Sequence, residues 1–107
     1  MKELLDMIRK TGEKIIPELK DNLDLESSGV TGTRKGEKEL EIKLLRKDGK
    51  AGDSSMIESL CKEFESQKML TEKADIQKDS EGNPSCTAMC NFNDKTFNLR
   101  LTIIPEH

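Results

Sequence analysis

Strict alternation of apolar and polar side chains makes residues 85–104 the most regular part of the chain. A period of two gives a strand one apolar face and one polar face. The apolar positions of the two arms are Cys86, Ala88, Cys90 and Phe92, followed by Phe97, Leu99, Leu101 and Ile103. Asn93, Asp94 and Lys95 separate the arms, and Asn and Asp tolerate the left-handed backbone of a tight turn. The pattern predicts a β-hairpin at the centre of the core.

Residues 2–23 repeat apolar side chains every three or four positions, which is the spacing of an amphipathic helix. Gly12 and Pro17 interrupt the pattern, because glycine is unfavourable inside a helix and proline removes a hydrogen-bond donor. We therefore expect a kink, or two short helices that meet near Ile16 and Pro17.

Residues 55–67 show the same helical spacing. Ser55 and Glu58 are three positions apart, as in a capping box that satisfies backbone N–H groups at the start of a helix. The buried stripe of this predicted helix consists of Ile57, Leu60, Cys61 and Phe64.

Three further strands are expected from alternation and turn residues. Residues 38–46 alternate clearly, with the apolar side chains on one face and Glu39, Glu41, Lys43 and Leu45 on the other. A short edge strand is predicted at 28–34, turning at Lys35 and Gly36. Another is predicted at 70–78, with Ala74 and Ile76 pointing inward.

The predicted order is α-β-β-α-β-β-β. Amphipathic helices need an apolar surface to pack on, and alternating strands offer one. Short connections favour antiparallel neighbours. We therefore expect an α+β fold, in which two helices pack on one face of a mostly antiparallel sheet of four to five strands. A chain of 107 residues is the size of one domain, which would span residues 1–107.

The charge is modest and unevenly distributed. The chain has a net charge of −3, and residues 53–83 carry eight acidic and four basic side chains. Proteins that bind nucleic acid directly usually carry a basic excess, which displaces counterions from the phosphates. We therefore expect neither direct nucleic-acid binding nor, in the absence of a long apolar run, membrane insertion. With no targeting segment in view, the expected location is the cytoplasm.

Catalytic and cofactor motifs are not recognisable in the sequence. The single histidine is His107, at the end of the chain, and a general base would otherwise have to be a carboxylate or a lysine. Glu39 and Glu41 share a strand face, which is more typical of a solvated face than of a catalytic pair. We predict that the protein is not an enzyme and holds no cofactor.

The three cysteines do not have the spacing of a metal site or of a disulfide framework. Cys86 and Cys90 are separated by three residues, and Cys61 lies far from both in the sequence. Structural zinc sites usually have four ligands and a two-residue spacing within each pair. We expect all three to be buried free thiols, with no metal bound.

Two surfaces are candidates for binding a partner protein. The outward face of the sheet would present charged and apolar side chains together, a composition found at protein interfaces, although an ordinary solvated sheet looks similar. Its candidate residues are Glu39, Glu41, Leu45, Met89 and Arg100. The acidic face of the 55–67 helix, with Glu58, Glu63 and Glu65, would suit a basic partner.

In size, charge and element order, with a leading helix from Leu4 to Leu23, the chain resembles the immunity proteins of bacterial polymorphic-toxin and contact-dependent inhibition systems. That resemblance implies a small cytosolic inhibitor, a monomer or weak dimer, which covers the active site of a basic cognate toxin such as a nuclease. The lack of Trp and Tyr departs from many such inhibitors. The alternative is an acidic secretion chaperone or a phage-encoded inhibitor of a host nucleoprotein.

Overall fold

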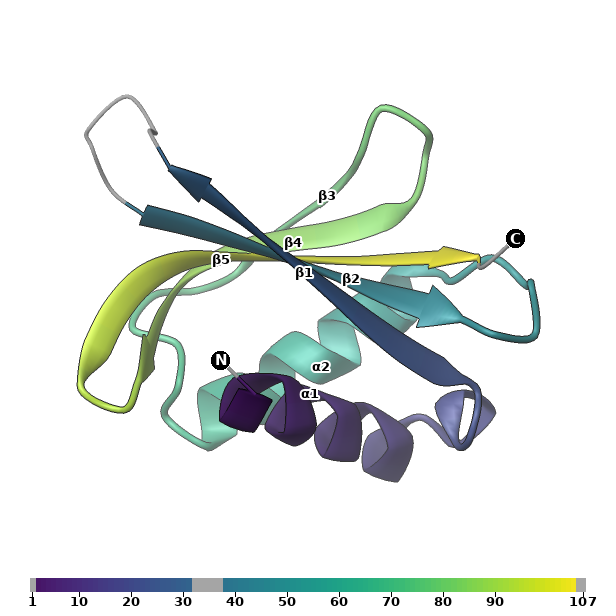
Figure 1. Ribbon diagram of the computed structural model, residues 1–107, viewed down its shortest axis with the longest axis horizontal. Helices are drawn as coiled ribbons and strands as arrows, with labels where there is room; N and C mark the ends of the chain where they lie inside the picture. Colours follow the sequence, from purple (N-terminus) through teal and green to yellow (C-terminus); the bar gives the residue numbers. More distant parts are fainter. Residues whose placement is uncertain (1, 32–37, 106–107) are drawn as a thin grey trace.

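The computed structural model describes residues 2–31 and 38–105, and its elements follow the predicted order (Figure 1). A short 3-10 helix, η1, is the one addition within this range. The elements are α1 (Lys2–Ile15), η1 (Pro17–Leu19), β1 (Leu23–Thr31), β2 (Lys38–Arg46), α2 (Ser54–Ser66), β3 (Asp75–Lys78), β4 (Pro84–Phe92) and β5 (Lys95–Pro105).

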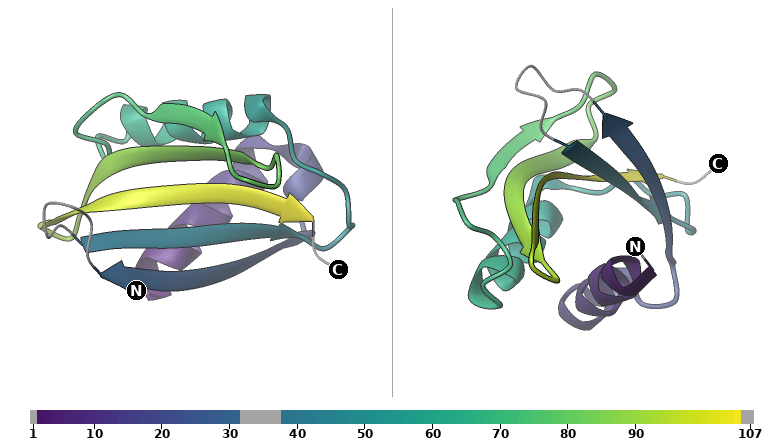
Figure 2. Two further views of the ribbon diagram at one scale, coloured as in Figure 1. Left: turned by 90° about the horizontal axis from the view of Figure 1, so that it is seen from above. Right: turned by 60° about the vertical axis from the view of Figure 1, so that its left-hand side comes forward.

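The five strands form one sheet in the order β1-β2-β5-β4-β3. β2 and β5 run parallel to each other, and the other neighbouring pairs are antiparallel. Both helices lie on the same side of the sheet, as Figures 1 and 2 show from three directions. The predicted α+β fold, with two helices on one face of a mostly antiparallel sheet, is confirmed.

The first helix is shorter than predicted, because a residue that precedes proline is pushed out of the helical conformation. α1 ends at Ile15, and Ile16 is extended, with φ −121° and ψ 97°. η1 then begins with Pro17. The two short helices expected near Ile16 and Pro17 are present, but the predicted range of 2–23 is wrong at its end, where Leu23 already belongs to β1.

β1 begins earlier than the strand predicted at 28–34. Leu23 follows Leu19 at a helical spacing, but Leu23 and Leu25 also alternate with Asp24 and Glu26 as strand residues do. Strand pairing decides the outcome, because Leu23 lies opposite Arg46 and Leu25 opposite Leu44 on β2. The turn predicted at Lys35 and Gly36 lies outside the described residues. β2 occupies 38–46, as predicted.

α2 is capped by a different residue from the one predicted. The carboxylate of Asp53 accepts a hydrogen bond from the backbone N–H of Met56 at 3.0 Å, and the hydroxyl of Ser55 donates to the same carboxylate. The helix starts one residue earlier than expected, so Ser55 lies in its first turn and the predicted Ser55–Glu58 capping box is wrong. The predicted stripe of Ile57, Leu60, Cys61 and Phe64 is buried.

The strand predicted at 70–78 is reduced to β3, Asp75–Lys78, and Leu70 makes only an isolated bridge to Cys90. Ala74 packs against the core, as expected. Ile76 lies opposite Cys86 in the pairing but keeps 37% of its surface exposed. The reason is its place in the sheet, since β3 is an edge strand with a neighbour on one side only.

The predicted hairpin is present as β4 and β5, but Lys95, which was predicted to lie in the turn, is the first residue of β5 and pairs with Phe92. Asn93 and Asp94 both have positive φ, 51° and 62°, which is the conformation that a two-residue turn between antiparallel strands requires. Its apolar face packs toward the helices, where Cys86, Cys90, Leu99, Leu101 and Ile103 are buried. The expectation that Cys61, Cys86 and Cys90 are buried free thiols is confirmed.

Arg46 is the one charged side chain among the buried residues of the described chain. It ends β2 on the side of the sheet that faces the helices. Its guanidinium donates to the carboxylate of Asp48 at 2.8 Å and to the backbone carbonyl of Ala51 at 2.9 Å. These bonds compensate the burial of the charge and fix the loop that leads into α2.

Candidate functional site

The side of the sheet that faces away from the helices is called here the open face. It is formed by alternate residues of all five strands, and Figure 2 (left) looks onto it with both helices behind. Its described side chains are Asp24, Glu26, Glu39, Glu41, Lys43, Leu45, Asp75, Gln77, Ser85, Thr87, Met89, Asn91, Asn98, Arg100, Thr102 and Ile104, with Thr96 at one end. Five of these side chains are acidic and two are basic, so the open face is negatively charged.

The charged residues predicted on this face come together at its centre. Strand register places Glu41 opposite Arg100 and Glu39 opposite Asn98. Arg100 reaches diagonally to Glu39, with 3.2 Å between the guanidinium nitrogen and the carboxylate oxygen. The side chain of Glu39 is only 15% exposed and that of Arg100 is 42% exposed. This ion pair holds the arginine against the sheet and leaves part of its side chain exposed to solvent.

The two apolar residues predicted on this face lie far apart on it. Residues that pair across neighbouring strands form rows on the open face. Met89 lies in the same row as Glu39 and Asn98, and Leu45 lies three rows further along, opposite Ile104. Ile104 is half-buried and was not among the predicted surface residues. The alternation gives its position, because Ile103 points inward and its neighbour must therefore point outward. The open face thus has a charged centre with apolar side chains near both ends.

Two hydroxyl side chains in the middle of the open face are almost fully buried. Ser85 is 2% exposed and Thr102 is 3% exposed, and their oxygens are 3.0 Å apart across the β4–β5 pair. Register places Lys43 beside Thr102 and Gln77 beside Ser85 in the same row. The two hydroxyl groups hydrogen-bond to each other, which fixes the positions of these short side chains between longer ones.

The acidic residues predicted on the second helix form a separate surface. Glu58 and Glu65 are exposed on α2, and Glu63 is half-buried. Because α2 packs on the inner face of the sheet, its solvent side and the open face point away from each other (Figure 1). The eight predicted partner-binding residues therefore belong to two surfaces that face in different directions.

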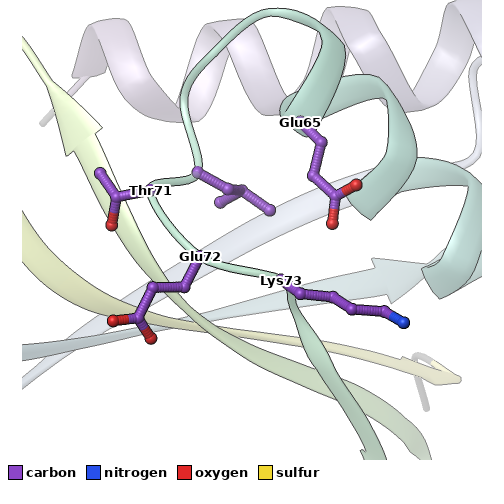
Figure 3. A pocket seen from close by; sticks show the side chains of 5 residues that line it. Glu65, Thr71, Glu72 and Lys73 are labelled. Atoms are coloured by element: carbon purple, nitrogen blue, oxygen red, sulfur yellow. The ribbon is translucent and has the colours of Figure 1, made fainter.

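A shallow pocket of about 340 Å³ lies beyond the end of α2. It is lined by Glu65, Leu70, Thr71, Glu72 and Lys73. Figure 3 shows the side chain of Glu65 extending from α2 toward the segment that carries Glu72 and Lys73. Of the residues predicted to bind a partner, only Glu65 lines this pocket. Residues 70–73 belong to the strand predicted at 70–78 and were not among the predicted binding residues. The pocket mixes acidic and basic groups and is open to solvent, which suits a surface contact better than a buried ligand.

Within residues 2–31 and 38–105, no three His, Cys, Asp or Glu side chains are grouped closely enough to hold a metal ion. No helix in the same ranges has the length and apolar character needed to cross a membrane. Compared with models of protein families and with curated proteins, the chain matches none of either.

Proposed function

We propose that this protein is a binding protein that inhibits a basic partner protein by covering its active site with the open face of the sheet. One observation carries the proposal. Both helices pack on the inner face, while the opposite face presents a charged centre between apolar side chains. A folded domain has to cover only one face of an antiparallel sheet to form its core, so the second face is available for binding.

The composition of the open face supports a protein partner. Protein interfaces combine apolar anchors with charged and hydrogen-bonding groups, and they are flatter than sites for small molecules. Leu45 and Ile104 give one apolar anchor and Met89 gives another. The open face carries more acidic than basic side chains, which favours a basic partner. Complementary charges accelerate the encounter of two proteins and fix their relative orientation.

The resemblance to immunity proteins supports a more specific form of the proposal. The partner is then a cognate toxin of a bacterial cell, for example a nuclease, and the complex forms in the cytoplasm. Carboxylates such as Glu41 would occupy the positions that substrate phosphates take in the basic cleft of a nuclease. A secretion chaperone is less well supported, because charged side chains occupy the centre of the open face where an extended apolar client would need a groove.

The test begins with the partner that copurifies with the tagged full-length chain from its native host, identified by mass spectrometry. Binding kinetics to the purified partner are then measured by surface plasmon resonance at low and high salt. We expect Leu45→Ser with Met89→Ser to accelerate dissociation, and Glu41→Lys to slow association. Association of the unmodified protein should slow as salt screens charges beyond about 10 Å.

The matched control is the triple variant Glu58→Lys, Glu63→Lys and Glu65→Lys, which changes the acidic surface of α2 instead. It should dissociate at the rate of the unmodified protein at both salt concentrations, and its association should slow only at low salt, because the three reversals change the net charge of the whole protein. Loss of binding in this control, with normal binding of the open-face variants, would move the interface to α2. The inhibitory part of the proposal is tested separately: a partner that keeps full activity when saturated with the protein would show binding without inhibition.

A further inference from the structure

Two of the three cysteines meet in the core between the sheet and the second helix. Cys61 lies on α2 and Cys86 on β4, and their sulfur atoms are 2.9 Å apart, within hydrogen-bonding distance. The two thiols are 3% and 2% exposed. Twenty-five positions separate them in the sequence, so the contact depends on how α2 packs on the sheet.

A bond between two cysteines needs sulfur atoms about 2.05 Å apart, with the side chains directed at each other. The Cys61 and Cys86 sulfurs already face each other across a contact that only has to shorten by less than one ångström. We propose that Cys61 and Cys86 form a disulfide when the folded protein meets hydrogen peroxide, so that oxidation ties α2 covalently to β4. The inference is independent of the proposed function.

The surroundings of the two thiols give them different roles. The hydrogen bond to Cys86 lowers the pKa of Cys61, and this outweighs burial and the nearby carboxylates of Glu65 and Glu58, which raise it. The hydrogen bond to Cys61, together with burial, raises the pKa of Cys86. The thiolate is the reactive form of cysteine, so the lower pKa favours Cys61 as the thiol that reacts first, with Cys86 resolving the product; the proposed bond itself rests on the contact between the two sulfur atoms.

In the first step, the thiolate of Cys61 attacks one oxygen of hydrogen peroxide and the O–O bond breaks. Cys61 becomes a sulfenic acid, and the released hydroxide takes up a proton to form water. In the second step, Cys86 loses its proton and attacks the Cys61 sulfur. An S–S bond forms, the S–O bond breaks, and the leaving hydroxide takes the proton from Cys86. Two thiols lose two electrons to one peroxide, and two waters are produced.

Cys90 provides an internal contrast. It lies on the same face of β4 as Cys86, but burial alone raises its pKa to about 11, so it remains protonated at neutral pH. Residues 86 and 90 are four positions apart along one strand, about 13 Å at a rise of roughly 3.3 Å per residue, too far for a bond. Cys90 is therefore the matched control for the pair.

The test treats the reduced, folded full-length protein with hydrogen peroxide and blocks the remaining thiols with iodoacetamide. When the oxidised protein is denatured and alkylated, its intact mass should correspond to the loss of two hydrogen atoms. It should also show that a single thiol has been alkylated. Peptide mapping should recover one linked pair, Cys61 with Cys86, and dithiothreitol should reverse the change. Cys90→Ser should form the link at the rate of the unmodified protein, whereas Cys61→Ser and Cys86→Ser should not form it.

Oxidation should also raise the urea midpoint of unfolding in the unmodified protein and in Cys90→Ser, because the link closes a loop in the unfolded chain. Peptide mapping of the unmodified protein decides the proposal even if a cysteine variant fails to fold. An unchanged mass, a gain of oxygen on separate cysteines, a link that includes Cys90, or a link between two chains would each overturn it.

Discussion

The backbone of Gly52 lies directly against the side chain of Ile103, so closely that a Cβ atom built on Gly52 would be 2.5 Å from Cγ2 of Ile103 and 2.9 Å from its Cβ. Ile103 is fully buried on β5 and has no space to withdraw. Gly52→Ala should therefore destabilise the protein by about 1–3 kcal/mol, the usual cost of overpacking a core. Urea unfolding measures this change.

Gly12 is the matched control for this substitution. A Cβ there would make ordinary contacts, the nearest at 3.4 Å with a terminal methyl of Leu23. Because alanine is the better helix former, Gly12→Ala in α1 should raise stability by up to about 1 kcal/mol. The two glycines should thus respond with opposite signs, and equal effects would contradict the close contact at Gly52.

Phe64 is the largest fully buried side chain of the described core. Phe64→Ala should reduce the free energy of unfolding by about 3–5 kcal/mol, because it removes apolar contacts and leaves a cavity. Phe97 packs only partly against the core, so Phe97→Ala should cost clearly less. An unchanged denaturation midpoint for Phe64→Ala would show that α2 does not contribute its stripe to the core.

The cap of α2 gives a third prediction. Asp53 accepts the N–H of Met56, so Asp53→Ala should cost about 1 kcal/mol of stability. Ser55→Ala should cost less, since the hydroxyl of Ser55 supports the Asp53 carboxylate and does not cap the helix itself. Thermal unfolding of the two variants distinguishes the assignments: a larger loss for Ser55→Ala would restore Ser55 as the cap.

Stability should depend on pH through the same carboxylate. The hydrogen bond from the Ser55 hydroxyl, and next the one from the backbone N–H of Met56, lower the pKa of Asp53 below its usual value. Because the pKa of Asp53 is lower in the folded state than in the unfolded chain, its carboxylate stabilises the fold at pH values above the ordinary Asp pKa of about 3.9. This contribution is lost as the pH falls from there through the folded pKa.

The variant Asp53→Asn isolates this effect, because asparagine also caps helices but does not titrate. Between pH 7 and pH 3, urea unfolding should show a smaller loss of stability for Asp53→Asn than for the unmodified protein. Other carboxyl groups, including Asp48, titrate in both proteins and cancel in the comparison. Equal losses would mean that Asp53 keeps its ordinary pKa in the folded state.

The elements that the sequence predicted best are those in which local pattern and turn chemistry agree. β2 occupies its predicted range, and the β4–β5 hairpin turns at Asn93 and Asp94 because both residues tolerate positive φ. The boundary between the first helix and β1 was missed. Leu23 fits both a helical and a strand period, and only its pairing with Arg46 on β2 decides between them.

Relationships between distant parts of the chain were beyond the reach of the pattern. Alternation put Glu39, Glu41 and Arg100 on the outward face, but the Glu39–Arg100 ion pair depends on the register of β2 with β5. The separation of the open face from Glu58, Glu63 and Glu65 depends on which side of the sheet α2 covers. The contact of Cys61 with Cys86 joins a helix to a strand, and spacing along the sequence carries no signal for it.

The position of β5 between β2 and β4 has a consequence for how the protein is made. A ribosome synthesises both helices and the other four strands before β5. Until β5 is made, the growing chain lacks the strand that lies at the centre of the sheet. The partners that meet in β2 and β5 are separated by more than half of the chain's length, and such distant pairing slows folding. A truncation that stops before β5 would therefore leave the β1–β2 pair and the β3–β4 pair without the strand that joins them into one sheet. Both pairs would have exposed strand edges, and the truncated chain would be prone to aggregate.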